Sequence, residues 1–148
     1  MGKVETPEDI LPHHYDHDVA GARIAQELLL SLRAPTRVLN AVTCVVRNHM
    51  RILRIREMRP VKKLQLVKDV VENKCCEAII DVAKADVNRH MGRLAQKEME
   101  KVKRVARMDV LDLGLDPEKL KGMGGSAISQ RVLMKRIAAL KNLDGNDC

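Results

Sequence analysis

Two histidines and one aspartate, His17, His49 and Asp86, each stand at helical spacing from a run of apolar residues. An imidazole or carboxylate that faces a protein core needs a partner, because burying a neutral polar group without one costs roughly 2–7 kcal/mol, and a charge costs more. Imidazole nitrogens and carboxylate oxygens are also good ligands for divalent metals. Taken together, the three residues suggest a common cluster, either a metal site or a structural His–Asp pair. Each residue alone is better explained as a satisfied core or rim residue.

Helices must position these side chains, because the apolar residues around them repeat with the period of a helix. The first stripe comprises Gly21, Ile24, Ala25, Leu28, Leu29 and Leu32, the second Val38, Val42 and Val45, and the third Cys75, Ile79 and Val82. Pro35 ends the first helix, Thr36 is a candidate N-cap for the second, and Pro60 suits the first turn of another. We expect all three stripes to face the core.

The remainder of the chain also favours helices. A short basic connector is expected over residues 51–59, and Asn73 is a candidate N-cap for the helix that ends near the aspartate. Gly92 is expected to mark a break before a charged helix over residues 94–108. A glycine-rich loop follows, and a last helix is expected to open at Ser126 and to end before Asp144.

The composition supports an all-α fold. The 148 residues include no Trp, no Phe and one tyrosine, Tyr15. Aromatic residues are common in β-strands, so an all-β fold is disfavoured. Modules that bind single-stranded nucleic acid by stacking bases on aromatic side chains are disfavoured for the same reason. The predicted fold is a compact bundle of about five to seven helices, with residues 1–15 as an irregular arm, 16–92 as one helical domain and 93–148 as a helical extension.

The cysteine spacing and the hydropathy pattern indicate the cellular compartment of the protein. None of the four cysteines forms a C-x-x-C pattern, and neither a signal-peptide segment nor an apolar run of transmembrane length occurs. These cysteines are Cys44, Cys75, Cys76 and Cys148. We therefore expect a reduced, cytoplasmic protein without a membrane association.

Basic residues gather in two runs within a chain of net charge +7. The first run comprises Arg47, Arg51, Arg54, Arg56, Arg59, Lys62 and Lys63, opposed by Glu57 alone. Arginine binds phosphate because its planar fork reaches two oxygens at once, so this run is the candidate RNA-binding surface. The second comprises Lys97, Lys101, Lys103, Arg104 and Arg107. Glutamates lie among these residues, and a solvated helix face with a Glu100–Arg104 pair explains that run equally well.

Several short motifs in order resemble the later part of the HD superfamily of metal-dependent phosphohydrolases. More narrowly, they resemble the C-terminal HD region of the bacterial CCA-adding tRNA nucleotidyltransferase and poly(A) polymerase family. The matching segments are His17-Asp18 with Gly21-Ala22, Val45 to Met50, Ala85-Asp86, Leu113 to Leu115 and Leu143 to Gly145. The resemblance covers roughly residues 15–145 and implies a partial, truncated HD-like domain. It adds Asp18 to the candidate metal ligands His17, His49 and Asp86, for Mg, Mn or Ni.

The family's first histidine and its His-Asp doublet lie upstream of the matching segments. His13 and His14 would need an unusual bend to replace them, and the ligand set is incomplete. The nucleotidyltransferase half, with a Gly-Ser segment and paired carboxylates, is not found either. We therefore expect a chain that is catalytically inactive alone.

The leading hypothesis is a non-catalytic module that binds tRNA-like RNA through its phosphate backbone. One alternative is a metal-dependent phosphohydrolase fragment or subunit. Another is a split or degenerate subunit that forms a homo-oligomer or joins a nucleotidyltransferase partner chain, because a missing helix pair would leave apolar surface exposed.

Overall fold

The computed structural model describes residues 17–87 and 89–145, and within these ranges it contains seven α-helices and one 3-10 turn but no strand. The predicted all-α class and helix number are confirmed. In chain order the elements are α1 (His17–Ser31), α2 (Thr36–Leu53), η3 (Ile55–Glu57), α3 (Pro60–Glu72), α4 (Cys76–Asp86), α5 (Arg89–Arg107), α6 (Pro117–Leu120) and α7 (Gly125–Gly145). The predicted arm over residues 1–15 lies outside the described residues.

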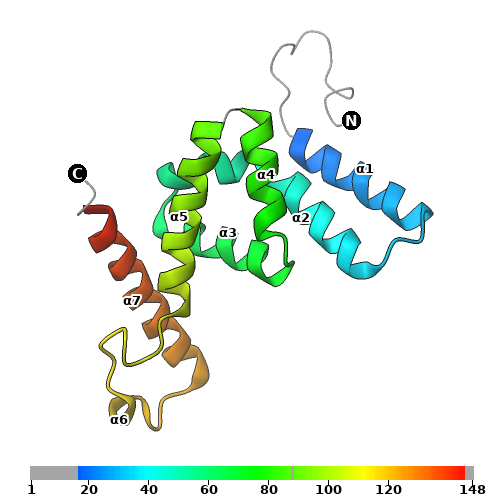
Figure 1. The fold of residues 1–148 in the computed structure, drawn as a ribbon. Coiled ribbons are helices and arrows are strands. Elements are labelled where there is room, and N and C mark those ends of the chain that lie inside the picture. The colour runs from blue at the N-terminus through cyan, green and yellow to red at the C-terminus, as the bar shows by residue number, and fades with distance from the viewer. Residues whose placement is uncertain (1–16, 88, 146–148) are drawn as a thin grey trace.

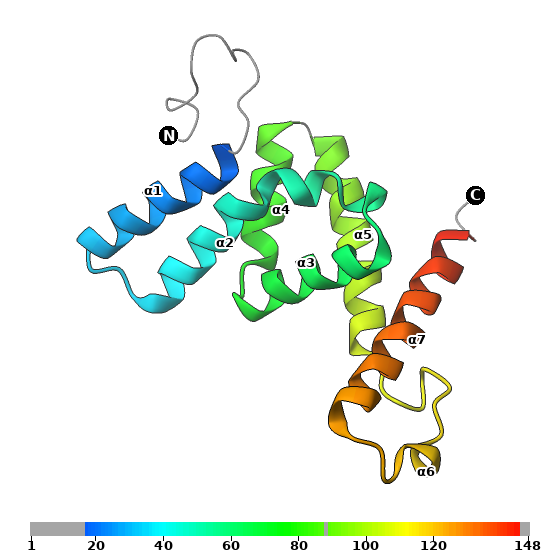
Figure 2. The same ribbon diagram turned by 180° about the vertical axis from the view of Figure 1, so that it is seen from behind.

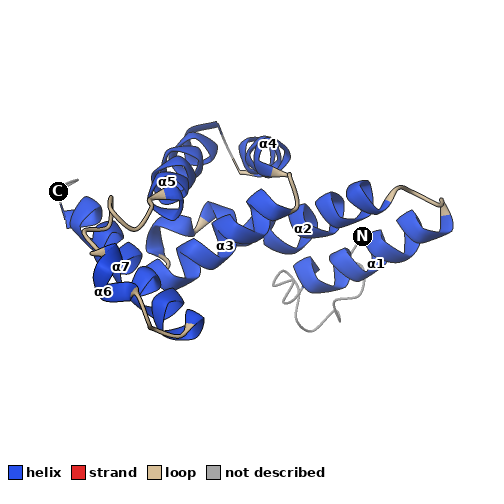
Figure 3. Ribbon diagram, turned by 90° about the horizontal axis from the view of Figure 1, so that it is seen from below, coloured by secondary structure: helices blue, strands red, loops and turns tan. Residues whose placement is uncertain are grey.

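The helices form a row with two distinct ends (Figures 1 and 2). Helices α1 and α2 make an antiparallel hairpin at one end, and α6 and α7 lie at the other (Figure 3). The C-terminal half of α2 joins α3, α4 and α5 in the middle, whereas α1 packs chiefly on α2. The hairpin therefore covers little of the central core. No helix among the described residues is long and apolar enough to span a bilayer.

One apolar core joins the central helices. Ile52 of α2, Ile55 of η3 and Leu66 of α3 are fully buried, as are Ile79 of α4 and Val102 of α5. Leu140 extends this cluster to α7. The core thus includes residues on both sides of the predicted domain boundary at 92/93, and α5 runs across that boundary.

The apolar stripe of α2 faces the core only in part. The buried residues of α2 are Cys44, Asn48 and Ile52, whereas Val38 is 40% exposed and Val42 is 36% exposed. The prediction was wrong for Val38 and Val42 because they lie in the N-terminal half of α2, away from the central helices (Figure 3), whereas Val45 of the same stripe is partly buried against the core.

The predicted break at Gly92 was also wrong, since this glycine lies buried within α5. The break falls before α5, after α4 has ended at Asp86. A Cβ atom on Gly92 would lie 2.9 Å from Cα of Lys84 in α4. Glycine is therefore required here for the close approach of two helices and not for a turn.

Three further boundaries differ from the predictions. Helix α2 continues to Leu53, through the first part of the expected connector, and Asn73 caps the C-terminus of α3 by donating Nδ2–H to the carbonyl of Asp69 at 2.8 Å. Helix α7 includes Asp144, so it does not end before that residue. Two lysines, Lys63 and Lys101, bind the carboxylate of Asp144.

Candidate nucleic-acid interface

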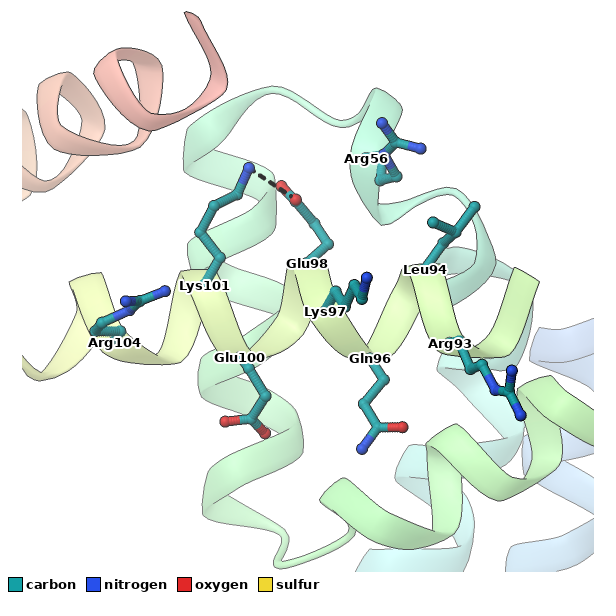
Figure 4. Close-up of a pocket in the computed structure, with 9 residues that line it drawn as sticks. All are labelled: Arg56, Arg93, Leu94, Gln96, Lys97, Glu98, Glu100, Lys101 and Arg104. Carbon is teal, nitrogen blue, oxygen red and sulfur yellow. Dashed lines mark ion pairs between the residues drawn. The ribbon is translucent and has the colours of Figure 1, made fainter. Parts of the chain in front are cut away.

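A basic trough runs along the solvent-facing side of α5 (Figure 4). It has a volume of about 750 Å³ and is lined by Arg56 of η3 together with Arg93, Leu94, Gln96, Lys97, Glu98, Glu100, Lys101 and Arg104 of α5. We call this surface the α5 trough. The opposite side of α5 carries Ala95, Met99 and Val102, which are buried. Core packing of α5 therefore fixes which of its charges face solvent.

The carboxylates in the α5 trough are already neutralised. Glu98 is bound by Lys63 at 2.5 Å and by Lys101 at 2.9 Å, and Glu100 is bound by Lys103 at 2.9 Å. Within the described part of the chain, no carboxylate is paired with Arg56, Lys97 or Arg104. The trough consequently presents an excess of positive charge to an anionic ligand.

Cationic side chains in the trough follow the pitch of the helix. One side of α5 carries Arg93, Lys97 and Arg104. The 11 helical steps from residue 93 to residue 104 span about 16 Å along the helix axis, at 1.5 Å per residue. That length matches roughly five nucleotides of a stacked strand at 3.4 Å each. The trough is thus long enough for several phosphates.

Beneath the trough lies an ionic cluster that joins α3, α5 and α7. It comprises Lys63, Glu98, Lys101 and Asp144. Lys63 is 2% exposed and reaches Asp144 at 3.1 Å in addition to Glu98, while Lys101 reaches Asp144 at 2.6 Å. Burial opposes ionisation of Asp144, but hydrogen bonds from Lys101 and Lys63 outweigh it and hold the pKa of this carboxyl below its usual value.

The predicted RNA-binding run is divided by the fold. Lys63 cannot contribute to a surface, because it is buried in the ionic cluster. Arg56 lines the α5 trough, whereas Arg47 and Arg51 line another hollow of about 400 Å³ together with polar residues of α1 and α3. Arg51 donates to Oδ1 of Asn48 at 2.7 Å. Arg54, Arg59 and Lys62 are exposed.

Three residues of the second basic run, Lys97, Lys101 and Arg104, line the α5 trough, whereas the sequence favoured the first run. The Glu100–Arg104 pair that would explain this run as a solvated helix face does not form, because Glu100 is bound to Lys103 instead. Arg93 was missed, although its i,i+4 spacing to Lys97 was a readable signal. Only the fold brings Arg56 beside these residues.

The four candidate metal ligands come together only in part. The rings of His17 and His49 lie 5.5 Å apart between centroids, in an edge-on arrangement. The Nδ1 of His49 lies 2.7 Å from the carbonyl of Val46, which accepts only, so Nδ1 carries the proton and Nε2 is the acceptor of the neutral ring. That tautomer suits metal ligation through Nε2.

The carboxylates do not complete this pair. Asp18 accepts a hydrogen bond from the backbone N–H of Val19 at 3.0 Å, and Asp86 is exposed at the end of α4. Across residues 17–87 and 89–145, no group of three or more histidine, cysteine or acidic side chains is placed to hold a metal ion. The described residues bring together two of the four predicted ligands, His17 and His49, and the four-ligand site stays a prediction.

Among the described residues, two cysteines, Cys44 and Cys75, pack within the apolar core. Cys44 and Cys75 are buried, and burial raises the pKa of the Cys75 thiol to about 12, with the neighbouring Cys44 and Cys76 acting in the same direction. A thiol of this kind is a poor nucleophile at neutral pH.

Comparison with known proteins relates the chain to one group of enzymes. It is 29% identical over 156 residues to the Multifunctional CCA protein of Actinobacillus pleuropneumoniae serotype 5b, a match that covers 99% of this chain and 36% of the relative. The Multifunctional CCA protein of Acinetobacter baumannii strain AYE is 28% identical over 149 residues, covering 95% of this chain and 35% of the relative. That of Neisseria meningitidis strain MC58 is 34% identical over 68 residues, 46% of this chain and 16% of the relative.

The predicted relation to the CCA-adding tRNA nucleotidyltransferases is confirmed by these similarities. The chain spans about a third of the length of the first two relatives, as their coverage of 36% and 35% indicates. No family profile and no solved structure matches the chain.

Proposed function

We propose that this chain is a non-catalytic module that binds the phosphate backbone of structured RNA of the tRNA type, with the α5 trough as its contact surface. The observation that carries the proposal is the trough itself, in which Arg56, Lys97 and Arg104 face solvent without carboxylate partners among the described residues. The relation to proteins named Multifunctional CCA protein supports tRNA as the RNA.

Phosphate contacts make a specific prediction about salt. With about four phosphates neutralised by the trough, the affinity for tRNA should fall roughly a hundredfold between about 50 and 200 mM salt. Each charge-reversed residue should also reduce the slope of log affinity against log salt by about one. An affinity that is flat over this range contradicts the proposal.

Charge reversal locates the surface. Lys97→Glu and Arg104→Glu should each weaken tRNA binding about tenfold or more at low salt in a filter-binding assay, because each replaces an attraction with a repulsion. Arg54→Glu tests the first basic run, which the sequence favoured as the RNA-binding surface, at a residue that does not line the α5 trough. Lys119→Glu on α6, whose side chain is 80% exposed, is a matched control and should leave affinity nearly unchanged. Equal losses in Lys97→Glu and Lys119→Glu contradict an interface on α5.

The absence of catalysis is part of the proposal and has its own test. A cyclic-phosphodiesterase assay with nickel or manganese should give no turnover with the purified chain. Metal-dependent turnover that disappears in His49→Ala would favour the phosphohydrolase alternative, to which the nearness of His17 and His49 lends some support.

The α1–α2 hairpin favours a second function, association with a chain that carries a nucleotidyltransferase half. Leu28 and Leu32 are 45% and 67% exposed, and Val38 and Val42 add to the uncovered apolar surface. Exposed apolar surface of this kind favours association. Co-purification with a nucleotidyltransferase chain should be lost in Val42→Lys and kept in the control Leu111→Lys, whose leucine is 68% exposed elsewhere. A monomer by light scattering that captures no such chain argues against this role.

A further inference from the structure

An apolar hollow lies where α3, α5 and α7 meet. Its floor consists of aliphatic side chains and its volume is about 360 Å³. The floor residues are Val61, Leu64, Val67 and Val71 of α3, Ala106 of α5 and Leu133 of α7. Val71 and Leu133 are each 40% exposed, so this surface is left open to solvent. The volume falls at the lower end of the range for small-molecule sites, about 300–1,000 Å³.

Cations surround the apolar hollow. Lys68, Lys103, Arg107 and Arg136 line it, together with one carboxylate, Glu72. Glu72 lies 3.7 Å from Lys68, and Lys103 is bound to Glu100 at 2.9 Å, so Arg107 and Arg136 supply the excess positive charge of the rim. The rim consequently favours an anionic ligand.

Arg136 is held in place on the α7 side of the hollow. Its Nη2 donates to the carbonyl of Met108 at 3.0 Å, while its buried Nε has no hydrogen-bond partner. A guanidinium fixed in this way presents a planar face at low cost in conformational entropy, and such a face stacks well on a planar ring.

The hollow is continuous with the α5 trough along α5. Lys103 and Arg107 line both the apolar hollow and an intervening depression, and Glu100 and Arg104 line both that depression and the trough. A strand whose phosphates follow the trough would therefore reach the hollow within the same contact.

We propose that the apolar hollow receives the unstacked base of one nucleotide, whose phosphate lies on Arg107. The inference rests on the proposed RNA-binding function and adds to it a contact with a base. An aliphatic floor offers dispersion contacts to a ring face, and arginine planes can replace aromatic platforms in stacking. The positive charge of the rim suits a phosphate, and the volume of the hollow suits one nucleotide. The near absence of aromatic residues thus does not restrict this chain to phosphates.

Two oligonucleotides of equal charge separate base contacts from phosphate contacts. One is a decamer of adenylate, and the other is a decamer of the same length that is abasic throughout. Wild-type protein should bind the adenylate decamer about five- to tenfold more tightly by fluorescence anisotropy. Equal affinity overturns the inference while leaving the phosphate-binding function intact. If neither decamer binds and tRNA also fails to bind, both proposals are wrong.

A single substitution tests the location. Leu133→Lys places a long cationic side chain in the hollow, so the preference for the adenylate decamer should disappear while affinity for the abasic decamer is retained or raised. Leu111→Lys adds the same charge at an exposed leucine outside the hollow and should keep the preference. Loss of preference in both variants, or in neither, contradicts the assignment to the hollow. Circular dichroism establishes that each variant is folded.

Adenosine 5′-monophosphate distinguishes a free nucleotide from a nucleotide within a strand. If it binds alone and Leu133→Lys abolishes that binding, the hollow takes a free nucleotide. If only the decamer shows the base preference, the hollow takes a base within a strand. If oleate binds in the hollow and no base preference is seen, the ligand is an acyl chain and the inference is wrong.

Discussion

Removing one member of the buried Lys63–Glu98 pair should be far more harmful than removing both. Glu98→Leu leaves the Lys63 ammonium, which is 2% exposed, with Asp144 as its remaining partner, and the side chain of Asp144 is 36% exposed. Breaking a buried pair in this way costs about 3–5 kcal/mol. This is a large fraction of the roughly 5–15 kcal/mol by which a domain is stable. Lys63→Met should cost less, because Glu98 keeps Lys101 at 2.9 Å.

The double variant Lys63→Met/Glu98→Leu removes both charges and puts apolar side chains of similar length in their place. Its stability should lie within about 1 kcal/mol of wild type, because the desolvation of two ions is also removed. Lys101 and Asp144 still pair at 2.6 Å in this variant. The coupling energy between the two sites should therefore be several kcal/mol in magnitude, well above the roughly 0.5 kcal/mol expected of independent sites.

Urea denaturation followed by far-ultraviolet circular dichroism suits this measurement, because the chain has no Trp and one Tyr but is largely helical. The melting temperature of Glu98→Leu should fall by roughly 6–20 °C, at about 2–4 °C per kcal/mol. A cycle at the exposed Lys68–Glu72 pair of α3, with both residues changed to Gln, is the control and should show coupling below about 1 kcal/mol. Additive losses at Lys63 and Glu98 would refute the reasoning.

Three further predictions follow from single side chains. Because the pKa of Asp144 is lower in the folded than in the unfolded chain, this carboxylate stabilises the fold at pH values above its unfolded-state pKa. The stability lost in Asp144→Asn should therefore be largest at neutral pH and should shrink below about pH 4. A loss of stability that does not depend on pH contradicts this prediction. Gly92→Ala should lower the free energy of unfolding by about 1–2 kcal/mol, because the added Cβ would meet the backbone of Lys84. Gly125→Ala is the control and should not lower it, since nothing lies within 4 Å of a Cβ atom there. Equal effects of the two substitutions in urea denaturation would disprove the packing argument. The pKa of about 12 predicts that Cys75 in the folded protein resists a thiol reagent at about pH 8. Cys75→Ser should therefore lower the extent of labelling only when the protein is unfolded. Labelling of the folded protein that this substitution abolishes would be inconsistent with burial of Cys75.

Helix positions were largely predictable, because proline placement and the period of apolar residues are local properties. Pro60 begins α3 as expected, whereas the N-cap residue of α2 is Pro35 and not Thr36. Gly92 was misinterpreted because a glycine required for packing against Lys84 has the same sequence signature as a glycine that ends a helix. Asp144 was misplaced because an Asp-Gly dipeptide is typical of a turn, and the lysines that bind its carboxylate in the structure are 43 and 81 residues away along the chain.

The candidate site was predictable by residue type but not by position. Arg56 lies on the α5 trough as part of the expected basic run, yet Lys63, seven residues later, is buried as an ion pair. Helical periodicity predicts which residues share a face, but it does not say which face meets another helix. For the same reason Val38 and Val42 were placed in the core, although the structure leaves them exposed.

The amino-acid sequence alone was enough to establish the helical class, the excess of basic residues and the relation to the CCA-adding enzymes, since composition, local periodicity and short motifs are written along the chain. Packing decided the remainder. It buried Lys63 with Glu98, joined Arg56 to Lys97 and Arg104, and opened an apolar hollow beside Leu133. These outcomes depend on contacts between residues far apart in the chain, where the burial of one charge or side chain is settled by all of its neighbours together.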